Sequence, residues 1–174
     1  MASDFEAADR FTEALNKLAG LRRFSGPPGI FWQSYIDALV DVTGAKFGLV
    51  ARRREGEEPG WRKVVASPAN LGGDGLKAFF AAVEALSDDC LKQGEARRDL
   101  GAADQDSAPD VGIAVRIDTG RPSERWVAVF LLSGPSGAAA DEALKRLQLA
   151  NCLPADVQHF QSANRAPGAA AQAA

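Results

Sequence analysis

The sequence is poor in the side chains that most often perform catalysis or bind metals. It contains one histidine, His159, and two cysteines, Cys90 and Cys152. A lone histidine excludes a multi-histidine metal site, and without partners at a motif spacing His159 is predicted to lie on the surface. Two cysteines are too few for a disulfide framework or a structural zinc site. We expect both to be small buried hydrophobic residues in a reducing compartment.

Long apolar runs and a large net charge are also missing. No apolar run approaches the ~18 residues that span a bilayer. The N-terminal stretch MASDFEAADR lacks the basic and apolar regions of a signal peptide. The net charge of −3 over 174 residues leaves no dominant basic face. We therefore expect a cytoplasmic globular protein that neither inserts into a membrane nor binds nucleic acid.

Motifs for phosphate binding and acid–base chemistry are incomplete. The segment LGGDG at 71–75 lacks the Lys-Ser/Thr ending of a P-loop. It predicts a turn with Asp74 as the N-cap of a helix, the alternative being a helix N-terminus that faces an anion. The acidic pairs Asp88/Asp89 and Asp104/Asp106 lie in polar stretches, not in the apolar setting that acid–base carboxylates need. We predict no catalytic activity and no metal site.

What the sequence does contain is a strong hairpin pattern at 111–133. Apolar residues alternate over 111–117, as in a strand with one face buried. The second run, 126–132, is apolar at every position, which is typical of a central strand covered on both faces. Gly120 and Pro122 interrupt the two runs and predict the connecting turn.

The rest of the chain supplies helices and further strands. An amphipathic helix is expected at 3–20 and a second helix at 30–43, ended by Gly44. Strands are expected at 45–54 and 61–67, followed by a helix from Asp74 to about 86 that restarts at Ser87 or Asp88. The polar segment 95–110 should hold a short strand near 97–100, and the last helix should be capped by Asp141 and ended or kinked by Pro154. Hairpins separated by a helical segment exclude a doubly wound parallel sheet. They predict an α+β fold with an antiparallel five- or six-stranded sheet of order 2-1-5-4-3. Helices 30–43, 141–152 and 3–20 should cover one face and 74–93 the other.

Three consecutive arginines, Arg52 to Arg54, end the first predicted strand. Glu55, Glu57 and Glu58 follow within four residues. Short blocks of mixed charge are usually solvated, so we predict a self-compensating strand end, and an anion site is the alternative.

This order of elements resembles that of a GAF domain, a small-molecule-binding sensory module found in phytochromes, cyclic-nucleotide phosphodiesterases and bacterial regulators. The likeness covers about 29–153 and rests on the helix before AKFGLVARRR, its partner WRKVVASP, the helical insert 74–93, and VGIAVRID with RWVAVFLLSG before the last helix. Profilin-like and PAS-like domains share much of this layout. The sharper motifs of the family are missing. Leu91 follows Cys90 where bilin-binding members have histidine, and the Asn-Lys-Phe-Asp-Glu motif of cyclic-GMP-binding members is absent. Two distant cysteines do not fit the members that reduce methionine sulfoxide.

The resemblance implies a bacterial signal-transduction domain at 29–161, preceded by a helix and linker at 1–28 and followed by a disordered tail at 162–174. It implies a ligand pocket between the sheet and helix 74–93, with 95–110 as a lid and with the ligand unidentified. The candidate lining residues are Phe79, Phe80 and Val83, and the candidate anchors for an anionic ligand are Arg97, Arg98 and Arg116. The alternative is a ligand-free scaffold in which the same aromatic residues fill the core.

Helix 3–20 lies outside the GAF-like core. Its stripe of Phe5, Phe11, Leu15 and Leu18 predicts a homodimer or a partner protein, the alternative being that the helix packs on its own domain. Because Pro154 would interrupt a continuous outgoing helix, we expect any output to pass through the N-terminal helix, a partner, or a segment that this chain lacks. The scaffold alternative includes an N-terminal part of a larger membrane-associated transport or signalling protein.

Overall fold

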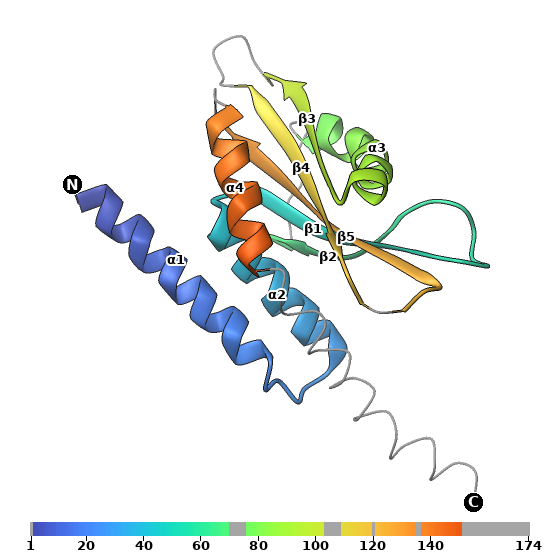
Figure 1. Ribbon diagram of the computed structural model, residues 1–174, viewed down its shortest axis with the longest axis horizontal. Coiled ribbons are helices and arrows are strands. Elements are labelled where there is room, and N and C mark those ends of the chain that lie inside the picture. The colour runs from blue at the N-terminus through green and yellow to red at the C-terminus, as the bar shows by residue number, and fades with distance from the viewer. Residues whose placement is uncertain (1, 70–75, 103–108, 120, 135–136, 151–174) are drawn as a thin grey trace, which may run out of the picture.

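The fold is a five-stranded antiparallel sheet with helices on both faces. The computed structural model describes residues 2–69, 76–102, 109–119, 121–134 and 137–150, without the side chains of 2–4 and 137–138. The strands are β1 (Phe47–Arg54), β2 (Arg62–Ser67), β3 (Glu95–Gly101), β4 (Asp110–Ile117) and β5 (Glu124–Ser133). Their order in the sheet is β2-β1-β5-β4-β3, and every pair is antiparallel (Figure 1). The predicted fold class and strand order are confirmed.

β5 lies at the centre because it is apolar on both faces. Val127, Ala128, Val129 and Phe130 are all fully buried. Alternate side chains of a strand point to opposite faces. Ala128 and Phe130 therefore join one core cluster, while Val127 and Val129 join the other.

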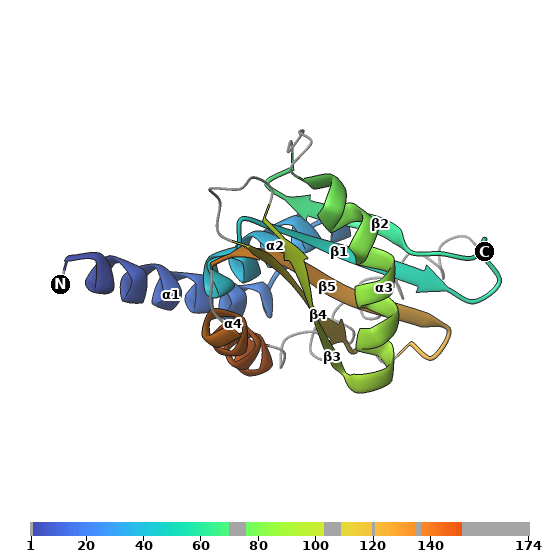
Figure 2. The ribbon, with the colours of Figure 1, turned by 90° about the horizontal axis from the view of Figure 1, so that it is seen from above.

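Two helices cover one face of the sheet, a third helix packs on the outer side of one of them, and one helix covers the other face. α1 (Ala2–Leu21), α2 (Pro28–Thr43) and α4 (Gly137–Ala150) lie on one side, and α3 (Lys77–Gln93) lies on the other (Figures 1 and 2). This arrangement confirms the predicted layers. α2 ends at Gly44, whose φ of 69° is readily adopted by glycine and whose N–H donates to the carbonyl of Val40. Trp32 of α2 stacks on Trp126 of β5, with ring centroids 4.6 Å apart.

α3 lies in close contact with the sheet. A Cβ atom added to Gly112 of β4 would be 2.7 Å from Cδ1 of the fully buried Leu86. No side chain larger than hydrogen fits between them unless Leu86 moves, so glycine allows this close approach.

Several predicted boundaries are wrong. α3 is one continuous helix from Lys77 to Gln93, and the restart predicted at Ser87 or Asp88 does not occur. Both residues continue the hydrogen-bonded helix because neither lies at its end. α4 begins at Gly137, so Asp141 lies inside it and does not cap it. The edge strand predicted near 97–100 is longer, at Glu95–Gly101.

Other predictions lie outside the described residues. These include the cap at Asp74, residues 103–108 of the predicted lid, Pro154, and the tail at 162–174. The two chemically distinctive residues near the C-terminus, Cys152 and His159, also lie there.

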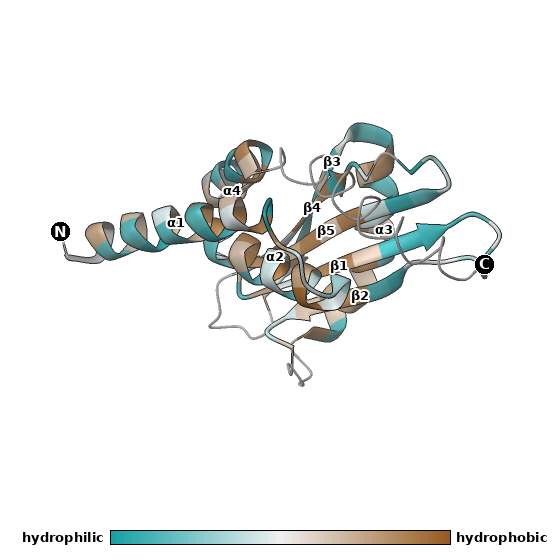
Figure 3. Ribbon diagram, turned by 90° about the horizontal axis from the view of Figure 1, so that it is seen from below, coloured by the Kyte–Doolittle hydropathy of each residue, from teal (hydrophilic) through white to brown (hydrophobic). Residues whose placement is uncertain are grey.

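α1 is buried over only part of its length. Ala14, Leu18 and Leu21 are buried, and α1 packs mainly on α2. Every side chain from Phe5 to Arg10 is exposed, and this half of the helix projects beyond the rest of the domain (Figure 3).

Candidate functional site

The three predicted lining residues belong to the packed interface between α3 and the sheet. Phe79 is 1% exposed and meets Phe47 of β1 edge to face, with ring centroids 5.4 Å apart. Phe80 is 45% exposed and covers the outer side of the same ring. Val83 is partly buried against this cluster. The cavity of about 50 Å³ beside Phe79 has room for a few water molecules at most, well below the ~300 Å³ of a small-molecule pocket.

The three predicted arginine anchors lie apart from these aromatic residues and from one another. Arg97 of β3 is 3.4 Å from Asp141 of α4, and Arg98 is 3.4 Å from Asp89 of α3. They are consecutive on a strand and so lie on opposite faces of the sheet. Arg116 is near the opposite end of β4 from the cavity beside Phe79. The structure does not bring the six predicted site residues together.

Cys90 is a buried thiol of α3. It is fully buried, and its Sγ is 3.4 Å from the carbonyl oxygen of Gly94. Burial raises the pKa of the Cys90 thiol to about 12, although the positive charge of Arg116 acts in the opposite direction. At neutral pH Cys90 is therefore uncharged, and a thiol is a poor nucleophile. The prediction of a small buried hydrophobic residue is confirmed for Cys90.

This environment predicts that Cys90 resists thiol reagents. In a Cys152→Ser variant, which leaves one cysteine, we expect no reaction with Ellman's reagent over an hour at pH 8, and complete reaction in denaturant. Absorbance at 412 nm measures both. Rapid labelling of the folded variant would contradict the buried position of Cys90.

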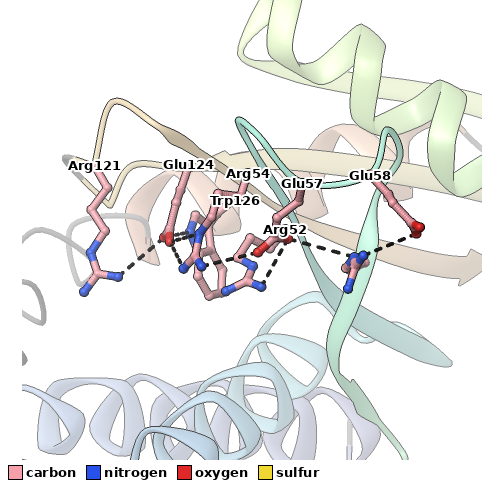
Figure 4. Close-up of polar contacts among 8 residues, drawn as sticks. Arg52, Arg54, Glu57, Glu58, Arg121, Glu124 and Trp126 are labelled. Carbon is pink, nitrogen blue, oxygen red and sulfur yellow. Dashed lines mark hydrogen bonds and ion pairs between the residues drawn. The ribbon is translucent and has the colours of Figure 1, made fainter.

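The most buried charged group of the sheet is Glu124 at the start of β5, whose side chain is 4% exposed. It lies directly opposite Arg54 in the β1–β5 ladder. The carboxylate accepts hydrogen bonds from Nε and Nη2 of Arg54, from Nε1 of Trp126 at 2.9 Å, and from Arg121 at 3.5 Å (Figure 4). We call these four residues the Glu124 network.

Competing effects set the pKa of Glu124. Burial alone would raise it, but the hydrogen bonds from Trp126 and Arg54 and the charges of Arg54 and Arg121 hold the pKa of this carboxyl below its usual value. The hydrogen bond and charge of Glu124 in turn raise the pKa of Arg54. The network is therefore ionised at neutral pH and fixes the end of the β1–β5 pair.

The arginine block of β1 is compensated partly as predicted. Glu57 lies within 4 Å of Arg52, Arg54 and Arg62 (Figure 4). The sequence prediction missed the partners that come from distant segments. Arg54 pairs with Glu124. The middle arginine of the block, Arg53, pairs through Nη1 with Oδ1 of Asp88 in α3 at 2.9 Å. Its Cζ atom lies 4.9 Å from the centroid of the Trp61 ring.

A larger pocket lies at the turn between β4 and β5, beside the Glu124 network. Its volume is about 430 Å³. We call it the hairpin-end pocket, and it is lined by Leu91, Arg116, Ile117, Asp118, Thr119, Arg121, Pro122, Glu124, Arg125 and Trp126. Of the predicted site residues it contains Arg116. Arg121 and Arg125 were not predicted because residues 119–124 were interpreted only as a turn; the available sign was one arginine within this turn and a second directly after it.

The described residues hold no group of three or more His, Cys, Asp or Glu side chains placed to bind a metal ion. Over the same residues, no helix combines the length and the apolar character needed to cross a membrane.

Comparison with solved structures identifies the architecture. The GAF domain of nlh2 from A. aeolicus, solved in an inactive state, matches 90% of this chain and 98% of its own length with a TM-score of 0.55 and 10% identity. The GAF domain of a protein assigned as a sensor histidine kinase from Pseudomonas syringae pv. tomato matches 99% of this chain and 96% of its own length, with a TM-score of 0.54 and 15% identity. The chain has a GAF-like fold.

The GAF-like fold confirms the resemblance predicted from the order of the elements. Identities of 10% and 15% establish the fold alone. No protein-family model matches the sequence, and no curated protein matches it either.

Proposed function

We propose that this chain is a non-catalytic regulatory domain that associates with a second copy of itself through α1. The GAF-like fold supports a regulatory role, since one of the two similar structures is a domain of a protein assigned as a sensor kinase. The uncharged, buried thiol of Cys90 supports the absence of catalysis by this thiol. In this proposal the domain works in the cytoplasm of a bacterium as part of a signalling protein.

The observation that carries the association is the projecting half of α1. Phe5 is 74% exposed, whereas Leu18 near the other end of the same helix is buried. A short helix without tertiary contacts is marginal in water. A partner that covers Phe5 would supply the apolar contacts that this half of α1 makes with nothing else in the described chain.

The charges along α1 favour a second copy in antiparallel orientation. Glu6, Asp9 and Arg10 are in the projecting half, where Arg10 pairs with Glu6. Lys17, which pairs with Glu13, is in the other half, and Arg22 and Arg23 directly follow the helix. Two antiparallel copies would place the acidic half of each helix beside the basic end of the other, and unlike charges at such a distance attract. A parallel pair would bring like charges together.

The test is the mass of the protein in solution, measured by light scattering. We expect a dimer for the full chain, and a monomer for a chain that starts at residue 26. We expect Phe5→Glu to weaken the dimer at least thirtyfold, since full burial of a phenylalanine contributes ~2–3 kcal/mol. Phe80→Glu is the matched control because Phe80 is also an exposed aromatic residue but lies on α3. A monomeric full chain, or a dimer that Phe5→Glu leaves intact, would remove the association.

Small-molecule sensing is the second candidate function, and the hairpin-end pocket favours it. A ligand between α3 and the sheet would have to displace Phe79 from the core. The hairpin-end pocket needs no such opening, and its ~430 Å³ is within the range of small-molecule sites.

A further inference from the structure

We propose that two copies of α1 pair through the face turned away from α2, with Asp9 of each copy beside Arg23 of the other. The inference rests on the association through α1 proposed above and adds the surface and the contacts that make it. We call this surface the outer face of α1, and it consists of Phe5, Asp9, Thr12, Asn16, Ala19 and Arg23.

The packing of α1 on α2 determines which face is left for a partner. Ala14, Leu18 and Leu21 are buried and recur at spacings of three and four residues, so they form the inner face. Phe5 precedes Ala14 by nine residues, which at about 3.6 residues per turn places the two side chains roughly 180° apart around the helix axis. A partner that covers Phe5 must therefore approach α1 from the side opposite α2.

The outer face runs the whole length of the helix. Its members lie three or four residues apart, and all of their side chains are exposed. The hydroxyl of Thr12 donates to the carbonyl of Ala8 at 3.0 Å, so it needs no acceptor from a partner. Arg23 follows the end of the helix, and its N–H donates to the carbonyl of Gly20 at 3.1 Å, which continues the helical winding.

A second helix can lie along this face without meeting the rest of the domain. The sheet, α2 and α4 are all on the other side of α1 (Figure 1). The inner side is also the side on which Arg146 of α4 lies over the ring of Phe11, with its Cζ atom 5.0 Å from the ring centroid. The outer face is therefore open along its length, whereas the inner face is already occupied.

Most charges of α1 are balanced within the helix. Arg10 pairs with Glu6 at 3.8 Å, and Lys17 pairs with Glu13 at 3.3 Å. Each of these pairs joins residues four apart and lies beside the outer face rather than on it. These four residues therefore need no charged partner from another molecule.

The two charges of the outer face itself are not balanced in this way. Within the described part of the chain, the side chains of Asp9 and Arg23 form no ion pair. They are near opposite ends of the face, so an antiparallel copy places each Asp9 beside the Arg23 of its partner. A two-fold axis produces this contact twice. A parallel copy would instead bring like charges together.

The same contact covers the exposed ring of Phe5. Phe5 and Asp9 are four residues apart and so lie side by side on the helix surface. The Arg23 side chain of the second copy can pack its aliphatic stem on the ring of Phe5 while its guanidinium reaches Asp9. One arginine from the partner thus satisfies both the apolar and the charged group of the projecting half.

The test is a charge exchange on the full chain, with the dissociation constant of the dimer measured by sedimentation equilibrium at low salt, where exposed charges are least screened. Asp9→Arg and Arg23→Asp each replace two attractive contacts by two repulsive ones. We expect each variant to raise the dissociation constant about tenfold. The double variant Asp9→Arg/Arg23→Asp restores unlike charges with their positions exchanged. It should return to within about threefold of the wild type.

Arg10→Asp is the matched control, because Arg10 is adjacent to Asp9 in the sequence but pairs with Glu6 beside the outer face. It should leave the dissociation constant within about threefold of the wild type. A wild-type chain that is monomeric removes the association and this arrangement together. A dimer that Phe5→Glu weakens but the single charge variants do not, or one that the double variant fails to restore, leaves the association standing and overturns the antiparallel outer-face contact.

Discussion

Replacing Phe79 with alanine is expected to lower the free energy of unfolding by about 3–5 kcal/mol, the range for removing a buried aromatic ring. Phe79 is 1% exposed and packs against Phe47 between α3 and the sheet. The variant loses the ring's contacts and leaves a cavity that this dense interface fills only in part. Urea unfolding followed by circular dichroism measures the difference.

Phe80→Ala is the matched control for this prediction. Phe80 is the next residue of the same helix and is 45% exposed, so we expect a loss below ~1.5 kcal/mol. If Phe79→Ala were as stable as Phe80→Ala, the α3 interface would be loose enough to hold a ligand, and the filled core described here would be wrong.

Replacing Glu124 with glutamine is expected to cost about 2–3 kcal/mol at pH 7, because the buried network loses its charged acceptor. The amide oxygen can still accept from Trp126, but the attraction to Arg54 and Arg121 is lost. The pKa of Glu124 is lower in the folded protein than in the unfolded chain, so its stabilisation is full above the unfolded value of ~4.3. That stabilisation is lost as the pH falls through the folded pKa.

The stability difference between wild type and Glu124→Gln should therefore shrink when urea unfolding is repeated below pH 4. Glu58→Gln is the control: its side chain is 90% exposed and its ion pair with Arg62 is on the surface, so we expect a change within ~0.5 kcal/mol. A difference at Glu124 that did not vary with pH would show that its charge does not stabilise the fold.

The sheet could be predicted because its pattern is local. The continuous apolar run 126–132 has no other stable place than the centre of a sheet, and the alternation at 111–117 identifies its neighbour. Gly44 marks the end of α2 through its positive φ, which a sequence pattern captures well. The continuity of α3 through Ser87 was missed, because a polar residue and two aspartates resemble a helix start even where tertiary packing continues the helix.

The candidate site could be predicted only in part, because it depends on register. Arg116 was identified as an anchor, and it does line the hairpin-end pocket. Its neighbours there are Arg121 on the β4–β5 turn and Arg125, the second residue of β5, and their position relative to α3 follows from where β3 begins. Glu124 was missed because its partner Arg54 is 70 residues away in the sequence. The aromatic residues Phe79 and Phe80 have the same sequence pattern whether they line a pocket or fill a core.

Hydrogen–deuterium exchange of α1 tests the proposed function most directly. The full chain is measured at a protein concentration above and at one below the dissociation constant of the dimer. The proposal predicts that the amides of residues 5–10 exchange slowly at the high concentration and rapidly at the low one, while α3 is unchanged. Equally rapid exchange of this segment at both concentrations would contradict association through α1.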